Sequence, residues 1–504
     1  MKKLFIYGAM ALSVVLSSCS DSFLEVEPTT QDLESTYYTT VDELESALVA
    51  AYDPLQWADY AWGQYNGFNF LSDAMSDDVR VGGGSVSDDK VLQMLRFFKA
   101  TGEYTPSDFW VVMYSGINRS NIAINKTEVF DGTITDTERS TIVSEGKTLR
   151  AFYYFWLWKL WGNVPYYSEN PTSEFIVPQM DADSVYSHII ADLDDVINAD
   201  ILPMKESSDR YGHVTQAMAM MLKTDAVLYQ NDESRYAECL SNMKTIISSR
   251  EYALVDSFAD LWESDNEWNT ETIFDINYFS VNGVRSWDNA LGCGGTVYPK
   301  LIGINGLNDP SGTYESGWGF EPVEKGIYDL YDDADQRKDA GILNMNKYIV
   351  ETGATYTPRY DDTGGYFLRK YLPRVGGNTG CVGSSDMNFD NNLRMYRYAQ
   401  TLLYAAELTL RTGGSVSDAQ GYFDQVRNRA YNGSAPVKTV SLDNILLENR
   451  LEFVGEGHRY FDLVRTGNAV SVLGSRGYTE DKKYLPIPQS EIDKAEGTLT
   501  QNAY

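Results

Sequence analysis

NILLENRLEFVGEGHRYFDLVRTG, residues 444–467, is the stretch that we take to decide the fold. It alternates opposite charges at intervals of three residues, which would align them along one side of a helix: Glu456, Arg459, Asp462 and Arg465. Large apolar side chains of the same stretch supply the buried faces: Phe453, Tyr460, Phe461, Leu463 and Val464. We interpret the stretch as a packing motif that locks the C-terminal helices together.

His458 lies in the same stretch, four residues before Asp462, and allows two interpretations. Asp462 could orient the imidazole as a general base, although no nucleophile is suggested nearby. We favour a packed or capping histidine, which needs no catalytic partner.

A second stretch, residues 145–166, reads EGKTLRAFYYFWLWKLWGNVPY and predicts a long helix. Its apolar residues recur at offsets of three and four: Leu149, Phe152, Tyr153, Trp156, Leu157 and Leu160. Gly162 ends the periodic pattern, with Pro165 just beyond.

Other helices are predicted on both sides of this one. Thr40 to Glu43 reads as a capping box before a helix that should end near Pro54. Paired helical segments occupy residues 215–248, about the 34-residue length of a tetratricopeptide unit, and 391–412 with 417–430. The tetratricopeptide consensus itself is missing, so the similarity is architectural. The chain is therefore predicted to be mainly α, with about four helix pairs.

Residues 249–390 have a different character. Residues 272–276 could form a strand, but the rest of the region is mostly Gly, Asn, Asp, Ser and Tyr without helical period. We predict a loop-rich insertion on the helical scaffold. Binding residues concentrate in loops held by a rigid scaffold, so this region is where we expect the ligand site.

The N-terminus reads MKKLFIYGAMALSVVLSSC, with Lys2 and Lys3 before an apolar run. This is the pattern of a secretory signal, and the run is too short to span a bilayer as a stable helix. Leu-Ser-Ser before Cys19 resembles a bacterial lipobox, which implies lipidation of Cys19 and a membrane anchor. The alternative is an ordinary signal peptide with an incidental cysteine.

The composition limits the partners. The net charge of −31 repels phosphate backbones, so nucleic acid is excluded as an expected partner, and membrane attachment must come from the lipid. The cysteines contain no CxxC pair, and the three histidines lack metal-ligand spacing. We expect no cofactor or metal; an acidic cluster could hold a structural Ca²⁺, but no EF-hand spacing supports one. If a disulfide forms, we expect Cys293 with Cys381.

Several segments together resemble the SusD/RagB family, surface lipoproteins that bind nutrients beside a TonB-dependent transporter in the outer membrane. They are residues 145–166 and 444–467, CSDSFLEVEPTT after the signal, RMYRYAQTLLYAAELTLRTGG at 394–414 and YLPIPQSEIDKAEGTLTQNAY at 484–504. The resemblance implies an oligosaccharide ligand, a SusC-like transporter as partner, and an outer-membrane, cell-surface location. The expected regions are a signal peptide (1–18), a lipidated tether (19–39), a helical region (40–248), the ligand-binding insertion (249–390) and a C-terminal helical region (391–504).

Carbohydrate binding needs flat aromatic faces edged by polar side chains. The family resemblance points, by region only, to an early loop and the insertion. The candidate residues are Trp287, Trp318, Arg80, Asp78, Asn289 and Tyr314, and Trp57 and Trp62 are weaker candidates. A tryptophan can equally anchor a long loop to the scaffold, so that alternative stays open.

Three other functions are considered. Adjacent carboxylates, such as Asp361 and Asp362, could suggest a glycosidase, but neighbours in a loop usually point apart, and chance pairs are expected in so acidic a chain. A peptide-binding member of the same family and a helical scaffold for proteins alone remain as alternatives. We expect a binding protein and not an enzyme.

Overall fold

A computed structural model describes residues 37–172 and 176–504; the predicted signal and Cys19 lie outside these ranges. The N-terminal helices are α3 (Val41–Trp57), α4 (Phe68–Met75), α5 (Lys90–Arg96), α6 (Ser107–Val129), α7 (Asp136–Trp161), α8 (Ala182–Ala199), α9 (Gln216–Gln230) and α10 (Tyr236–Ser249). The insertion contains α11 (Tyr298–Ile302), α12 (Lys325–Tyr328), α13 (Arg337–Gly341) and α14 (Met345–Thr352). The C-terminal helices are α15 (Tyr398–Arg411), α16 (Val416–Ala430), α17 (Leu442–Glu452), α18 (Arg459–Arg465), α19 (Ala469–Leu473) and α20 (Gln489–Lys494).

The strands form two-stranded antiparallel sheets: β1 (Val164–Pro165) with β2 (Gln179–Met180), β3 (Thr272–Ile276) with β6 (Leu393–Arg397), and β4 (Ile342–Asn344) with β5 (Tyr366–Leu368). Short 3₁₀ helices lie in the connections: η2 (Ser208–Arg210), η3 (Glu233–Arg235), η4 (Ala259–Trp262), η5 (Ser264–Asn266), η6 (Arg369–Tyr371), η7 (Ser385–Met387), η8 (Gly474–Arg476) and η9 (Glu480–Lys482). No helix in the described ranges is long and apolar enough to cross a membrane.

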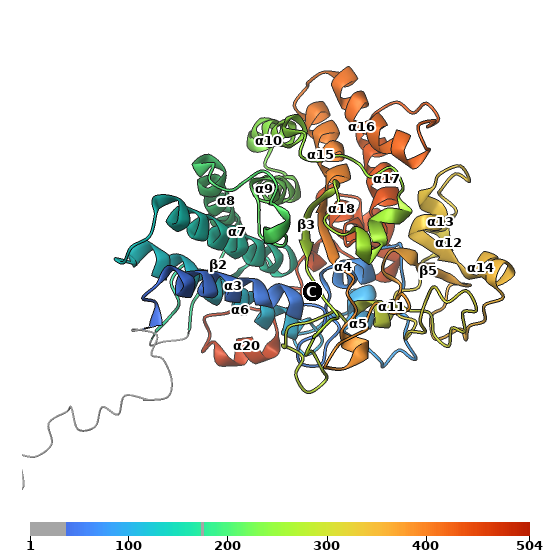
Figure 1. Cartoon of the computed structure of the whole chain (residues 1–504), viewed down its shortest axis with the longest axis horizontal. Coiled ribbons are helices and arrows are strands. Elements are labelled where there is room, and N and C mark those ends of the chain that lie inside the picture. The colour runs from blue at the N-terminus through green and yellow to red at the C-terminus, as the bar shows by residue number, and fades with distance from the viewer. Residues whose placement is uncertain (1–36, 173–175) are drawn as a thin grey trace, which may run out of the picture.

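The helices pack in succession as four pairs: α3 with α6, α7 with α8, α9 with α10, and α15 with α16. Figure 1 shows them as an arc, from the blue α3 through green to the orange α16, with the loop-rich insertion on the other side. The predicted mainly α scaffold of four helix pairs with an irregular subdomain is confirmed. The last pair is brought next to α10 although the insertion separates them in the sequence.

The helix ends follow local sequence signals. Thr40 and Glu43 form the predicted capping box of α3, and α7 ends at Gly162 with a left-handed φ of 70°. The predicted end of α3 at Pro54 is wrong, because the helix continues to Trp57. Proline frees the carbonyl four residues earlier, and the Ala50 carbonyl accepts a hydrogen bond from Arg119 Nη1 at 2.9 Å.

Residues 272–276 form strand β3, as predicted, but its partner was missed. Residues 393–397, predicted as the start of a helix, form β6, and the helix α15 begins only at Tyr398. β6 pairs antiparallel with β3, so the sheet joins the start of the insertion to its end. The two arginines of this strand, Arg394 and Arg397, make buried ion pairs that a continuous helix would not place beside β3.

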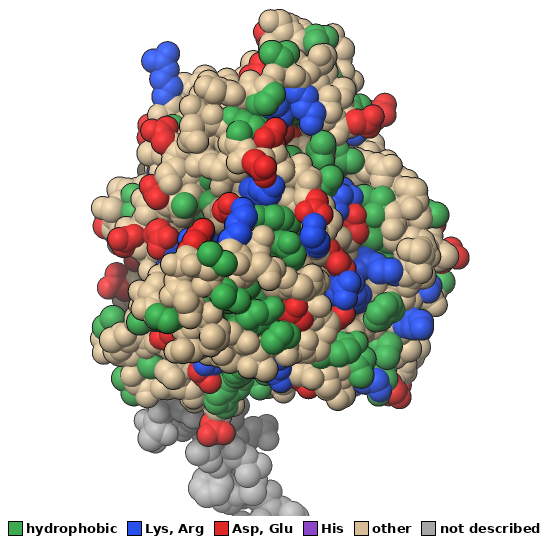
Figure 2. All heavy atoms as spheres, turned by 90° about the vertical axis from the view of Figure 1, so that its right-hand side faces the viewer, with side chains coloured by type: hydrophobic (Ala, Val, Ile, Leu, Met, Phe, Trp, Pro, Cys, Tyr) green, Lys and Arg blue, Asp and Glu red, His purple; other side chains and the backbone are tan. Residues whose placement is uncertain are grey.

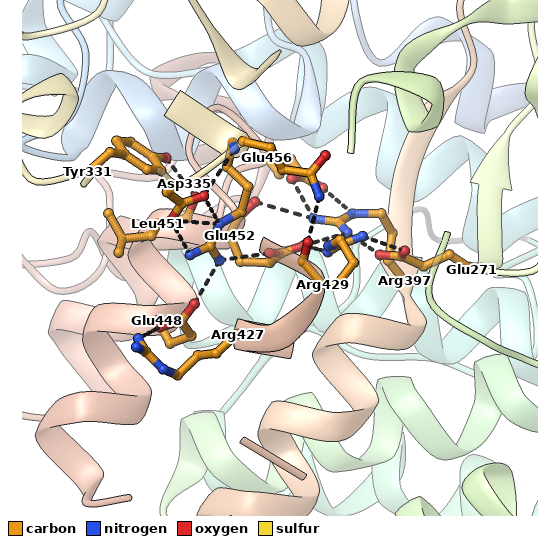
Figure 3. A network of polar contacts seen from close by, with 12 residues as sticks. Glu271, Tyr331, Asp335, Arg397, Arg427, Arg429, Glu448, Leu451, Glu452 and Glu456 are labelled. Atoms are coloured by element: carbon orange, nitrogen blue, oxygen red, sulfur yellow. Dashed lines mark hydrogen bonds and ion pairs between the residues drawn. The ribbon is translucent and has the colours of Figure 1, made fainter. Parts of the chain in front are cut away.

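A buried ionic network joins the insertion to the C-terminal motif (Figure 3). Arg397, at the end of β6, contacts Glu271, Glu452 and Glu456 at 2.5 to 3.0 Å. The other cations bind carboxylates of the same cluster: Arg337 (Asp335, Glu448 and Glu452), Lys370 (Glu456), Arg427 (Glu448) and Arg429 (Glu271 and Glu452). Cations and carboxylates therefore neutralise one another inside the protein.

Glu452 is the centre of this network. Burial alone would raise the pKa of its carboxyl group, but the charges of Arg429, Arg397 and Arg337 outweigh that effect and hold the pKa well below its usual range. Glu452 is fully buried and stays ionised because three guanidinium groups surround it. A buried charge of this kind is costly to leave unpaired.

The predicted packing role of residues 444–467 holds, but most of the expected pairs differ. Only Asp462 and Arg465 pair with each other, at 2.7 Å. Glu456 instead binds Arg397 and Lys370, and Arg459 binds Asp77. Glu456 precedes α18, so the interval of three does not continue along one helix.

The face formed around α12 to α14 is not uniformly acidic. Figure 2 shows Lys and Arg side chains interspersed with Asp and Glu on this side of the molecule. Lys347 with Asp339 and Lys338 with Asp333 are ion pairs of this region. Acidic side chains on this face are therefore partly paired with basic ones, although the chain as a whole carries a net charge of −31.

We predict that Glu452→Gln destabilises the protein by about 3 to 5 kcal/mol, because three buried arginines lose their shared carboxylate. Urea denaturation followed by circular dichroism measures the free energy of unfolding. The matched control is Glu491→Gln, which removes a pair with the exposed Lys494 and should cost less than about 1 kcal/mol. Equal effects of the two substitutions would contradict the central role of Glu452.

Candidate ligand-binding site

Four aromatic rings from three distant segments meet at the surface, and we call them the aromatic platform: Tyr60, Tyr65, Trp287 and Trp318. Trp287 and Trp318 are stacked, with ring centroids 5.8 Å apart and an interplanar angle of 25°. Tyr60 meets the edge of Trp287 at 5.2 Å, and Tyr65 lies 6.2 Å from Trp318. Trp287 is 39% exposed, so its ring is available to a ligand.

A tight turn presents Trp287. Ser286 and Asn289 exchange both backbone hydrogen bonds, at 3.2 and 2.9 Å, which leaves Trp287 and Asp288 at the tip. The fully buried Arg285 fixes the base of the turn by a bidentate ion pair with Asp59. Arg285 also donates to the Tyr60 carbonyl at 2.6 Å. One guanidinium group therefore places the Trp287 turn against the loop that carries Tyr60.

Trp318 is held through its backbone. Its N–H donates to the Lys300 carbonyl at 2.9 Å, and its carbonyl accepts from Arg359 Nη1 at 3.0 Å. The preceding Gly317 crosses Gly303 so closely that a Cβ atom on Gly317 would lie 2.3 Å from the Gly303 Cα. The sequence thus needs glycine at this crossing, and the crossing brings Trp318 under Trp287.

Asp89 supports the fourth ring of the platform. Its carboxylate caps α5 by accepting the N–H of Leu92 at 2.9 Å, and it also accepts a backbone hydrogen bond from Tyr65. Burial raises the pKa of Asp89 to about 6. The loop of Tyr65 is therefore tied to the start of α5.

Two of the predicted ligand residues meet in this platform, and Asn289 is exposed in the same turn as Trp287. The other three candidates bond to neighbouring side chains, and two of them are buried. Asp78 is buried and bonded to Arg450 at 2.7 Å, and Tyr314 is buried in a small second core and accepts from Arg369 at 3.0 Å. Arg80 pairs with Glu324 and Asp361 at 2.7 and 3.2 Å.

The two weaker candidates separate in the same way. Trp57 is buried at the end of α3, with Arg119 over its ring at 4.6 Å. Trp62 is 53% exposed and contacts no ring of the platform. An exposed tryptophan in the right loop is thus not by itself a platform residue.

Other groups considered in the sequence make no reactive centre among the described residues. His458 packs against Phe453, and its pKa is lowered to about 4 by burial, while Asp462 turns its carboxylate to Arg465. Cys293 and Cys381 are free, so the expected disulfide is not formed; Cys381 Sγ contacts the Gly383 carbonyl, and Cys293 lines a separate cleft. Nor do the described His, Cys, Asp and Glu residues form a group that could hold a metal ion.

Comparisons with known proteins identify the family of this chain. Residues 270–504 match the family model described as "SusD family", and residues 22–223 match "Starch-binding associating with outer membrane". The surface glycan-binding protein A of Bacteroides thetaiotaomicron, solved in complex with laminarihexaose, is 42% identical, with a TM-score of 0.86 over 92% of this chain and 99% of that chain. This chain belongs to the SusD family.

Two further SusD-family relatives extend the comparison. A structure described as a laminarin binding SusD-like protein is 34% identical, with a TM-score of 0.82 over 92% of this chain and 98% of that chain. The starch-binding protein SusD of Bacteroides thetaiotaomicron is 25% identical over 78% of each chain. The family resemblance of the sequence motifs is confirmed.

The residues that build the aromatic platform were only partly visible in the sequence. Trp287 and Trp318 stand out in polar, glycine-rich segments, and Tyr60 and Tyr65 belong to an aromatic early loop. The Arg285–Asp59 pair and the support of Tyr65 by Asp89 were not predicted. Their partners are far apart in the sequence, and no local spacing signals them.

The pKa of Asp89 predicts a pH dependence of stability. The unfolded carboxyl group has a pKa of about 3.9, so the folded state binds a proton more tightly between about pH 4 and pH 6. Stability from this group is therefore greatest below pH 4 and falls as the pH rises through 6. Compared with the Asp89→Asn variant, the wild-type protein should lose about 2 to 3 kcal/mol of unfolding free energy between pH 4 and pH 7.

Urea titrations of both proteins at several pH values measure this difference in unfolding free energy. Their difference isolates Asp89 from the other carboxylates, which titrate in both proteins. A constant difference between pH 4 and pH 7 would contradict the assigned role.

Proposed function

We propose that this protein captures an oligosaccharide on the aromatic platform and acts by binding alone. The observation that carries the proposal is the stacked pair of Trp287 and Trp318, contributed by two separate loops, with Trp287 open to solvent. The apolar face of a sugar ring packs on such a surface, and the exposed Asp288 and Asn289 in the same turn can bond its hydroxyl groups. The relative solved with laminarihexaose supports a glucose oligosaccharide as the ligand class.

The proposed ligand class is tested with two probes, laminarihexaose and maltohexaose. They represent the glycans named for the laminarin-binding and starch-binding relatives. Isothermal titration calorimetry on the chain that begins after Cys19 gives the affinity for each. Incubation with the same sugars and analysis for shortened products tests the absence of hydrolysis, and released sugar would contradict action by binding alone.

We predict that Trp287→Ala and Trp318→Ala each weaken hexasaccharide binding at least about tenfold, or about 1.4 kcal/mol. Trp287 loses the stacking surface, and Trp318 is the ring that backs it. Trp62→Ala is the matched control, because Trp62 is more exposed than Trp287 but lies outside the platform. Wild-type affinity in both platform variants would sink the proposal.

We also propose that the protein delivers its ligand to a SusC-like TonB-dependent transporter while the lipid on Cys19 holds it at the outer membrane, displayed at the cell surface. The family resemblance and the match to a starch-binding, outer-membrane-associating model over residues 22–223 support this role. A tether raises the effective concentration of the captured sugar at the transporter.

In cells, Cys19→Ala should release the protein from the membrane fraction and slow uptake of the oligosaccharide, although the platform is unchanged. Cys381→Ala, which alters another cysteine away from the anchor, should leave both unaffected. Fractionation with immunoblotting and uptake of labelled sugar measure the two effects. Uptake at the wild-type rate by Cys19→Ala cells would contradict delivery from the membrane, and surface display is tested by protease treatment of intact cells.

A further inference from the structure

A second aromatic stack lies away from the platform. The rings of Tyr211 and Trp268 are nearly parallel, at 13°, with centroids 5.2 Å apart, and Tyr211 is 36% exposed. Trp287 on Trp318 has the same construction, with a 39% exposed outer ring. Among the stacked aromatic pairs in residues 37–172 and 176–504, these are the two that contain tryptophan.

Tyr211 lines a cleft of about 300 Å³ formed by α3, the loop before α9, the end of β3 with Asp275 and Ile276, and the segment that follows it. Figure 1 shows the C-terminal half of α3 passing below β3 in the middle of the molecule. The volume is at the lower end of the range for small-molecule sites. It suits a ligand of one or two rings.

Asn277 hydrogen-bonds to both residues of the second aromatic stack. Its Nδ2 donates to the Tyr211 carbonyl at 3.0 Å, and its Oδ1 accepts from Trp268 Nε1 at 2.7 Å. Its backbone carbonyl accepts from Gln56 Nε2 at 2.7 Å. One side chain therefore sets the stack and, through its backbone, a polar wall of the cleft.

Two residues at the stack, Gly212 and Trp268, have positive φ angles. Gly212 has a φ of 106°, and a Cβ atom there would lie 2.3 Å from Asn277 Nδ2. Trp268 has a φ of 53°, which is rare for a bulky residue and costs conformational energy. The surrounding contacts hold this strained tryptophan directly behind Tyr211.

Polar groups in the cleft remain available to a neutral ligand. His213 uses Nδ1 on the buried Glu145 at 2.8 Å, and its Nε2 has no partner among the described residues. The Oε1 atom of Gln56 is similarly without a partner in the part of the chain that the structure describes. No Lys or Arg within residues 37–172 and 176–504 lines the cleft, and the Asp53 carboxylate is paired with Arg119 at 2.8 Å. An anionic ligand is therefore disfavoured.

We propose that the Tyr211 cleft is a second saccharide subsite, which binds one or two neutral sugar rings by stacking on Tyr211 and hydrogen bonding to His213 and Gln56. The inference rests on the proposed function for the chemistry of the ligand. An exposed ring backed by tryptophan, with unpaired polar groups around it, is the arrangement that the platform also has. Two sites on one chain would raise the avidity for a long glycan above that of either site.

Cys293 gives a direct readout, because this exposed thiol lines the same cleft. The chain that begins after Cys19 is made with Cys381→Ser, which leaves Cys293 and the buried Cys239. Trp287→Ala and Trp318→Ala are added to remove the platform. Laminarihexaose, at millimolar concentration, should slow alkylation of Cys293 by N-ethylmaleimide about threefold, as followed by mass spectrometry.

Tyr211→Ala in this background should abolish the protection, whereas Phe97→Ala, which truncates a similarly exposed ring outside the cleft, should keep it. Circular dichroism checks that each variant is folded. An unchanged alkylation rate, with hexasaccharide binding retained by the intact platform, would overturn the second subsite alone. Wild-type protein that binds no hexasaccharide would overturn both proposals. If laminarihexaose protects Cys293 but Trp287→Ala and Trp318→Ala leave the hexasaccharide affinity unchanged, only the platform would be overturned.

Discussion

The buried carboxylate of Glu452 is the constraint on which the arrangement of this protein depends. Arg337 comes from the insertion, Arg397 from the end of β6 and Arg429 from α16, and all three bind Glu452. Such a network adds less stability than a well-packed apolar core would, but it strongly penalises any arrangement that leaves a charge unpaired. We interpret it as the feature that specifies which segments meet.

The binding surface depends on this arrangement through a short chain of contacts. Glu271 of the network immediately precedes β3, and β3 leads into the loop that carries Arg285 and Trp287. Arg285 then reaches back to Asp59, which lies next to Tyr60 in the loop that follows α3. The aromatic platform is thus assembled from loops, and the buried Arg285–Asp59 ion pair determines where the Trp287 loop lies relative to Tyr60.

The sequence alone correctly predicted the structural features that have local sequence signals. Periodic apolar residues and end signals such as Gly162 located α7, and the capping box at Thr40 located the start of α3. Local signals failed where tertiary contacts decide: Arg119 lets α3 continue past Pro54, and β3 draws residues 393–397 into a strand.

The same contrast between local signals and tertiary contacts applies to the aromatic platform. Trp287 and Trp318 could be chosen because tryptophan is unexpected in polar loops, whereas Asp78 and Tyr314, equally plausible by composition, are buried in the framework. Their different positions result from pairing with Arg450 and Arg369, which are distant in the sequence. Local sequence therefore predicts which residues are suited to a sugar, but the fold decides which of them belong to the aromatic platform.

The central claim is that Trp287, backed by Trp318, is the surface on which the glycan lies. A crystal structure of the chain that begins after Cys19, grown with laminarihexaose, tests this most directly. We predict a sugar ring parallel to the Trp287 indole and in van der Waals contact with it, at about 4 Å. A bound hexasaccharide that leaves Trp287 and Trp318 uncovered would contradict the account.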